Sequence, residues 1–229
     1  MVDNPNPFDA LSPAGRAFSA NWQLCLLAGL VWSVVNIAVA APTLLLDILE
    51  LSGTAAADSL GPDGELAVTV FRGLNALFNF FVGSVLGVGL AQFSLKIADT
   101  GTAELDDLIP DFDRILGGLS AATIAVILMT IGILACCLPG IVAYAATLFW
   151  PFILVAERKS GFESIVLSVE VFRDNPLVMI LFGFFLMVLF LIGAGCCHIP
   201  SVAVVPFAYI VMAFAYRQVR PLQPSLDEG

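Results

Sequence analysis

The stretch ILACCLPGIVAY, residues 133–144, joins two long apolar runs through a pair of cysteines and a proline. A second stretch of the same pattern, IGAGCCHIPSVAV, occurs at 192–204. Very few residues separate the apolar runs in either stretch, so each pair of runs is expected to fold back on itself. A helix of about 20 apolar residues crosses the hydrocarbon core of a bilayer. The two cysteine turns therefore predict two transmembrane hairpins.

The composition indicates a membrane setting for the whole chain. Hydrophobic residues make up 59% of the sequence and charged residues 12%, whereas a soluble domain has about 25% charged residues. Six apolar runs are long enough to cross a bilayer, near 21–46, 66–96, 116–137, 140–156, 177–196 and 201–216. The predicted fold is an all-α, polytopic transmembrane helical bundle with six spans, whose first partner is the lipid bilayer. Nucleic acid is not expected as a partner, because the net charge is −10 and nucleic acid attracts basic surfaces.

The distribution of Lys and Arg predicts the orientation, because these residues collect at the cytoplasmic ends of spans. Of nine such residues, eight fall on one side of a six-span topology and only Arg72 falls toward the other. We therefore predict a multi-pass protein of the cell (inner or cytoplasmic) membrane with both termini in the cytoplasm. Residues 1–20 are expected to form a cytoplasmic segment with a short amphipathic helix, 21–217 the transmembrane domain, and 218–229 a cytoplasmic tail. The motif AVAAP in the first span resembles a signal-peptide cleavage site, but the apolar run continues beyond it, so an intact span is expected.

An amphipathic stretch precedes the last hairpin. GFESIVLSVEVFRDNP, residues 161–176, places Phe162, Ile165, Val169 and Phe172 on one face of a helix. We expect this helix to lie at the cytoplasmic surface and to brace the bundle through that face. Docking of a partner and lipid sensing are the alternatives.

Related stretches precede the other two hairpins. AELDDLIPDFDRIL at 103–116 sets apolar positions against a run of acids, and Pro110 interrupts it, so two short turns are expected. FSANW at 18–22 is a weaker copy ahead of the first span. The sequence thus predicts three repeats, each a cytoplasmic amphipathic helix followed by a transmembrane hairpin.

Ionisable residues inside a membrane usually mark function, and the middles of the six runs have none. Arg72, near the external end of the second span, is the residue to weigh. We expect it to form an ion pair with Asp47 or Glu50, with a ligand contact as the alternative. The only histidine is His198, and the sequence contains no hydrolase, metalloprotease or phosphate-loop motif. The chain is therefore predicted not to be an enzyme, and no cofactor is expected.

Two prolines and three glycines predict features of helix packing. Pro151 and Pro206 lie inside the fourth and sixth spans and are expected to kink them. Such kinks are interpreted as packing devices, with a ligand cavity as the alternative. The motif GSVLGVGLA supplies Gly83, Gly87 and Gly89, which are expected at close helix contacts within the chain or with a partner subunit.

The cysteines of the two turns, Cys136, Cys137, Cys196 and Cys197, allow three interpretations. Unbonded packing residues are favoured. A disulfide between the turns is the second interpretation, because the turns face the external side, where disulfides persist; it requires Cα atoms within about 7 Å. A zinc site that includes His198 is the third, although adjacent cysteines depart from the usual C-x-x-C spacing.

The segment LPGIVAYAATLFWPFILVAERKSGFESIVLSVEVFRDNP, residues 138–176, carries a family resemblance. The residues of the pattern are a Pro-Gly pair, a charged patch, a serine and an asparagine: Pro139, Gly140, residues 157–159, Ser168 and Asn175. The chain from about residue 86 onward resembles a broad group of uncharacterised prokaryotic multi-span membrane proteins, whose nearest named relative is the membrane domain of some glycerophosphoryl diester phosphodiesterases. No segment of this sequence corresponds to the catalytic domain of those enzymes. The resemblance therefore implies fold and membrane placement, and no reaction.

The predicted function is a non-enzymatic membrane scaffold or accessory subunit, with a second copy of itself or another membrane protein as partner. The alternative is a channel or transporter for an uncharged or amphiphilic solute, with its path near the kinking prolines. A central cavity lined by Pro151, Pro206 and polar side chains would favour transport. A filled core with an exposed groove of small residues would favour a scaffold.

Overall fold

The computed structural model describes residues 6–51, 61–135, 137–195 and 200–220. Within these residues the chain is helical and has no β-strand. Six segments are long and apolar enough to cross a membrane: Trp22–Ile48, Glu65–Thr100, Phe112–Ala135, Leu138–Ala156, Pro176–Gly193 and Ser201–Val219. The predicted all-α bundle of six spans is confirmed, and the chain is a multi-pass membrane protein.

The elements follow one another as three helical hairpins, each preceded by a short helical element. The first unit contains η1 (Pro7–Ala10), α1 (Leu11–Ala20), α2 (Trp22–Leu51) and α3 (Gly61–Thr100). The second contains η3 (Leu105–Leu108), α4 (Phe112–Ala135), α5 (Cys137–Ala146) and α6 (Trp150–Ala156). The third contains α7 (Gly161–Asp174), α8 (Pro176–Gly195) and α9 (Ser201–Val219). This order matches the three expected units, while their relation as a repeat stays a prediction.

The stretch before the second hairpin divides at its proline. η3 ends at Leu108, Pro110 follows in the connection, and α4 begins at Phe112, because proline lacks the N–H that would continue a helix. Ile109 is 73% exposed and Phe112 is 71% exposed. These two apolar side chains therefore face the surroundings of the protein and do not pack on the bundle.

α7 packs on the bundle through a face that differs from the predicted one. Its buried residues are Gly161, Ser164, Ile165, Ser168 and Val171. Phe162 is instead 65% exposed, so its predicted place on the packing face is wrong. The physical reason is close approach: a Cβ on Gly161 would collide with the backbone of Gly117 in α4. Small and hydroxyl side chains permit that approach, and a phenylalanine would prevent it.

The core lies between α3, α6, α8 and α9 and is filled by aromatic rings. Phe93, Phe149, Phe152, Phe182 and Tyr216 are fully buried. The ring of Tyr216 lies 6.1 Å from that of Phe149 and 6.2 Å from that of Phe152, centroid to centroid. Rings at these separations attract one another beyond the area they bury.

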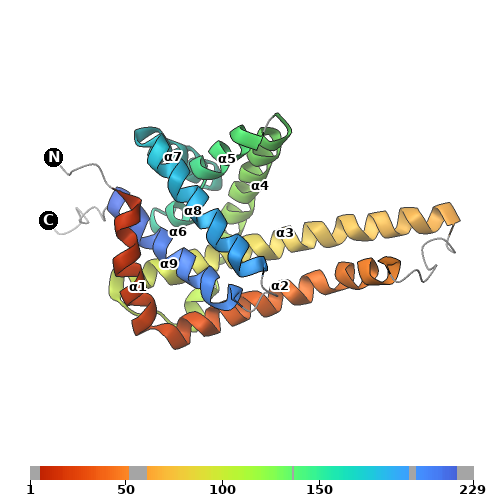
Figure 1. The fold of residues 1–229 in the computed structure, drawn as a ribbon, viewed down its shortest axis with the longest axis horizontal. Helices are drawn as coiled ribbons and strands as arrows, with labels where there is room; N and C mark the ends of the chain where they lie inside the picture. The colour runs from red at the N-terminus through yellow and green to blue at the C-terminus, as the bar shows by residue number, and fades with distance from the viewer. Residues whose placement is uncertain (1–5, 52–60, 136, 196–199, 221–229) are drawn as a thin grey trace.

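The hairpin of α2 and α3 extends away from the other helices (Figure 1). The 40 residues of α3 correspond to a length of about 60 Å, at 1.5 Å per residue. No residue in 34–48 or 65–83 is buried. The outer half of this hairpin therefore contributes nothing to the core and is left to lipid or to a partner.

Candidate functional site

Three helices end together in a cluster of polar contacts, which we call the polar end (Asp99, Glu157, Tyr216, Arg217 and Arg220). Arg217 of α9 donates through Nε and Nη2 to the two carboxylate oxygens of Asp99 on α3, at 2.7 and 2.5 Å. Arg220 donates to Oε1 of Glu157 at 2.5 Å, and the Tyr216 hydroxyl donates to the same oxygen at 3.0 Å. These bonds join α9 to the last turns of α3 and α6.

The two described ends of the chain meet near these contacts. Pro7 of η1 and Val219 of α9 line the same cavity, and η1 packs against α9. Lys96 of α3 also pairs with Asp107 of η3, at 2.9 Å. The first and last described residues therefore lie on the same side of the bundle, and Arg72 lies on the hairpin that extends away from it (Figure 1).

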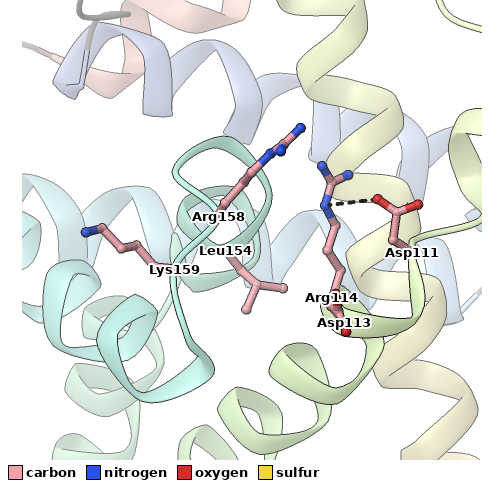
Figure 2. Close-up of a pocket in the computed structure, with 6 residues that line it drawn as sticks. All are labelled: Asp111, Asp113, Arg114, Leu154, Arg158 and Lys159. Carbon is pink, nitrogen blue, oxygen red and sulfur yellow. Dashed lines mark ion pairs between the residues drawn. The ribbon is translucent and has the colours of Figure 1, made fainter.

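A cavity of about 280 Å³ opens between the start of α4 and the connection from α6 to α7. It is lined by Asp111, Asp113, Arg114, Leu154, Arg158 and Lys159. Figure 2 shows the guanidinium groups of Arg114 and Arg158 extending toward the same part of the cavity, while Lys159 points away. We call this hollow the cationic pocket.

Arg114 is anchored on one side and open on the other. Its Nη1 donates to Oε1 of Gln92 on α3 at 2.6 Å, and its Nε lies 3.8 Å from a carboxylate oxygen of Asp111. The Asp111 side chain is 79% exposed, and exposed pairs at such distances contribute little. Since a guanidinium has five N–H donors, Arg114 keeps several for another acceptor.

Arg158 is held in an unusual backbone conformation. Its φ of 51° makes it the only non-glycine residue with positive φ among the described residues. It follows the end of α6, a position where glycine is the common choice, and a side chain there costs roughly 1–2 kcal/mol. The Arg158 side chain forms no hydrogen bond or ion pair with any described residue. An arginine thus stands at a place where glycine would fold more easily.

The helix that follows the pocket is capped by its own side chains. The Glu163 amide donates to Oγ of Ser160 at 3.3 Å, and the Ser160 amide donates to Oε2 of Glu163 at 3.1 Å. The bond from the Ser160 amide lowers the pKa of the Glu163 carboxyl. The free amides of this N-terminus are therefore partly satisfied from within α7.

The fourth span is broken, and a side chain from α7 closes the break. Pro151, as predicted, disturbs the helix: α5 ends at Ala146 and α6 begins at Trp150. Oγ of Ser168 accepts from the Phe149 amide at 3.1 Å and donates to the Ala146 carbonyl at 2.8 Å. Ser168 is 1% exposed. Irregular backbone is tolerated at membrane depth only where such partners exist, so Ser168 makes the break possible.

A further hollow of about 200 Å³ lies beside this break. Its lining includes Tyr144, Thr147, Pro151, Tyr209 and Met212, and no charged side chain among the described residues. Thr147 directs its hydroxyl to the Ala143 carbonyl of its own helix, at 2.8 Å. The hollow is therefore mainly apolar, and Pro206 is not part of its lining.

Pro206 lies inside α9, which runs on past it to Val219. Proline cannot donate to the carbonyl four residues back, which is that of Val202. The backbone of α2 approaches this same carbonyl at Gly29, where a Cβ would collide with it. Gly29 was not singled out in the sequence, since nothing local marks it as a crossing point.

The three predicted contact glycines have different surroundings. A Cβ on Gly89 would collide with the backbone of Leu108, and one on Gly87 would lie 3.2 Å from the Tyr209 hydroxyl. Both positions serve contacts within the chain. A Cβ on Gly83 would meet nothing within 4 Å.

The α2–α3 hairpin carries three half-buried asparagine side chains, here called the asparagine seam (Asn36, Asn75 and Asn79). Asn75 donates to the Val39 carbonyl at 3.1 Å, and Asn79 donates to Oδ1 of Asn75 at 2.8 Å. Asn36 donates to the Trp32 carbonyl at 2.8 Å. The side-chain oxygens of Asn36 and Asn79 accept no hydrogen bond from the described residues.

Beyond the seam, Arg72 donates to Oδ1 of Asp47 at 2.8 Å, which is one of the two partners expected from the sequence. The side chains of the two residues are 41% and 61% exposed.

The cysteine turns fall largely outside the described residues. Cys136, Cys196 and Cys197 are not described, and of Cys137 only the backbone is described, as the first residue of α5. Their packing, disulfide and zinc interpretations stay predictions.

Comparisons with protein-family models, with curated proteins and with solved structures found no match to this chain.

The cationic pocket was not predicted from the sequence, in which its basic residues indicated only the orientation of the spans. The signal available was their shared position at span ends on one side of the predicted topology. Their meeting depends on how α4 packs against α6 and α7, which the sequence does not state.

Proposed function

We propose that this chain is a non-enzymatic membrane scaffold or accessory subunit that associates with a second copy of itself through the α2–α3 hairpin. The observation that carries the proposal is the absence of any buried residue in 34–48 and 65–83, beside a bundle core filled by aromatic rings. A hairpin that adds nothing to its own core is suited to contacts outside the chain.

The asparagine seam supports a second copy as the occupant. An amide side chain is both donor and acceptor, so the same residue can pair with itself across a two-fold axis. The side-chain oxygens of Asn36 and Asn79 accept no hydrogen bond from any described residue, which leaves them available for such bonds. Polar side chains of this kind strengthen helix association in lipid.

We further propose that the polar end faces the cytoplasm of a cell membrane, because eight of the nine Lys and Arg residues belong to that side of the topology. The resemblance to the membrane domain of glycerophosphoryl diester phosphodiesterases is part of the proposal. Three residues of its pattern have structural partners. Gly140 lies against Gly132, where an added Cβ would be 2.8 Å from the Gly140 Cα. Glu157 accepts from α9, and Ser168 closes the broken span.

A channel or transporter for an uncharged or amphiphilic solute is the second candidate, and the broken fourth span favours it, because transporters use discontinuous helices. Two observations weigh against it. Ser168 already satisfies the Phe149 amide and the Ala146 carbonyl at the break. The hollow beside it is also mainly apolar.

The test is the oligomeric state in lipid. We expect the full chain to form a dimer in nanodiscs, as counted by mass photometry, and Asn36→Leu combined with Asn79→Leu to shift it toward monomer. Thr43→Val is the matched control, because Thr43 lies on the same hairpin outside the asparagine seam and its hydroxyl donates to the Ala40 carbonyl of its own helix. A wild-type monomer at all protein-to-lipid ratios, together with solute flux in liposomes that Pro151→Ala abolishes, would replace the scaffold by the transporter.

A further inference from the structure

We propose that the cationic pocket binds the phosphate group of an anionic phospholipid, with Arg114 and Arg158 as the residues that contact it. This goes beyond the scaffold function and does not depend on it. The chemistry recognised is a phosphate ester, which a lipid headgroup or a soluble phosphate could supply, and the pocket's surroundings favour the lipid.

The arrangement of the two arginines fits a phosphate. They come from different elements, the first turn of α4 and the end of α6, and their guanidinium groups extend toward the same space (Figure 2). Planar guanidinium groups bind phosphate oxygens through paired N–H donors. Arg158 has no partner among the described residues, and Arg114 has only Gln92 and a distant Asp111.

The pocket gathers cationic groups in an acidic protein. Three cations and two carboxylates are among its lining residues, whereas the whole chain has a net charge of −10. Because Lys159 points away, the cationic groups in the shared space are those of Arg114 and Arg158, and Asp111 and Asp113 reduce their attraction for an anion. Since two cationic side chains gain little from lying near each other without an anion, a bound phosphate accounts for an arrangement that the fold does not require.

Exposed apolar side chains beside the pocket indicate that the source is a lipid. Ile109 and Phe112 flank Asp111 in the chain and are 73% and 71% exposed. Phe162 is 65% exposed and lines a shallow hollow together with Lys159. Apolar rings beside basic groups are typical of the membrane interface, and basic pockets at the cytoplasmic side of spans hold lipid headgroups. A soluble phosphate has no acyl chain that could contact these apolar side chains.

The test uses the purified full chain in a nonionic detergent, with lipid retention measured by native mass spectrometry. Wild-type protein should retain phosphatidylglycerol in preference to phosphatidylcholine. Arg158→Gly should weaken that retention about tenfold, because the variant loses one group that forms charge-assisted hydrogen bonds with the phosphate. Thermal stability should be unchanged or higher in this variant, because glycine accepts positive φ without strain, so a loss of binding cannot be ascribed to misfolding.

Two further arms decide the outcome. Arg173→Gln removes the same charge at an exposed site in the last turn of α7 and should retain phosphatidylglycerol like the wild type. Equal losses in the two variants would show attraction by net charge alone and would overturn the proposal. Inorganic phosphate and glycerol 3-phosphate should compete weakly; if either stabilises the lipid-free protein as strongly as phosphatidylglycerol does, the lipid is not the ligand.

Discussion

Replacing Ser168 by alanine should destabilise the protein more than any other loss of a single hydroxyl on α7. The serine is the shared partner of the Phe149 amide and the Ala146 carbonyl, at 3.1 and 2.8 Å. Both groups lie in buried residues of a segment apolar enough to span a membrane, where water is a poor substitute for the hydroxyl. Each unsatisfied buried group costs about 1–3 kcal/mol, and because two groups lose their partner, Ser168→Ala should lower the free energy of unfolding by about 2–6 kcal/mol.

Ser164→Ala is the matched control on the same face of the same helix. Ser164 is also fully buried, but its hydroxyl donates to the Ser160 carbonyl at 2.9 Å. That carbonyl already accepts from the Ser164 amide at 2.9 Å, so alanine leaves no backbone group without a partner. The expected loss is below about 1 kcal/mol.

Unfolding by SDS in mixed micelles measures both free energies, and hydrogen exchange reports locally on the Phe149 amide. That amide should exchange faster in Ser168→Ala and remain protected in Ser164→Ala. Equal destabilisation by the two substitutions, or unchanged protection of Phe149, would refute the account of Ser168 as the group that closes the break.

Two other perturbations test the packing and the electrostatics of the chain. Gly29→Ala should lower the free energy of unfolding by about 1–3 kcal/mol, because its Cβ would collide with the rigid backbone of Val202. Gly83 has open space around it, so Gly83→Ala should be neutral or should stabilise the protein by up to about 1 kcal/mol. Thermal unfolding in detergent compares the two variants. The bond from Ser160 lowers the pKa of Glu163 below its ordinary value of 4.5, so the stabilising contribution is present above pH 4.5 and is lost as the pH falls through the folded-state pKa. Hydrogen exchange in the first turn of α7, corrected for intrinsic rates, should become faster over that pH range in the wild type. It should not change with pH in Glu163→Gln, because the side-chain amide oxygen still accepts from the Ser160 amide. A wild-type profile that is equally independent of pH would contradict the capping role of the carboxylate.

The sequence predicted most of the architecture because the bilayer imposes strong conditions on composition. Apolar runs of sufficient length located all six spans, and Pro110 and Pro151 marked places where helices stop or break. α8 begins at Pro176, one residue beyond the end of α7 at Asp174, because proline disfavours the helical conformation in the residue before it and is itself accepted in a first turn. Each of these features depends on a residue's own covalent structure or on a local run of residues.

The packing face of α7 was not predictable in the same way. Hydrophobic periodicity selected Phe162 for the interior, and the structure exposes it. In a membrane the usual contrast is absent, because lipid tails accept phenylalanine as readily as a protein core does. The helix instead turns its small residues inward, where Gly161 permits contact with α4.

The sequence by itself determined the number of spans, the helical class and the places where proline interrupts a helix, since these follow from local composition and from the missing N–H of proline. Only the tertiary structure decided which residues meet across the bundle. It brought Ser168 to the broken span and placed Arg114 and Arg158 on one pocket. The reason is physical: local patterns govern how a chain enters the bilayer, whereas contacts between spans depend on the shapes of side chains that are distant in sequence and become neighbours only when the helices pack.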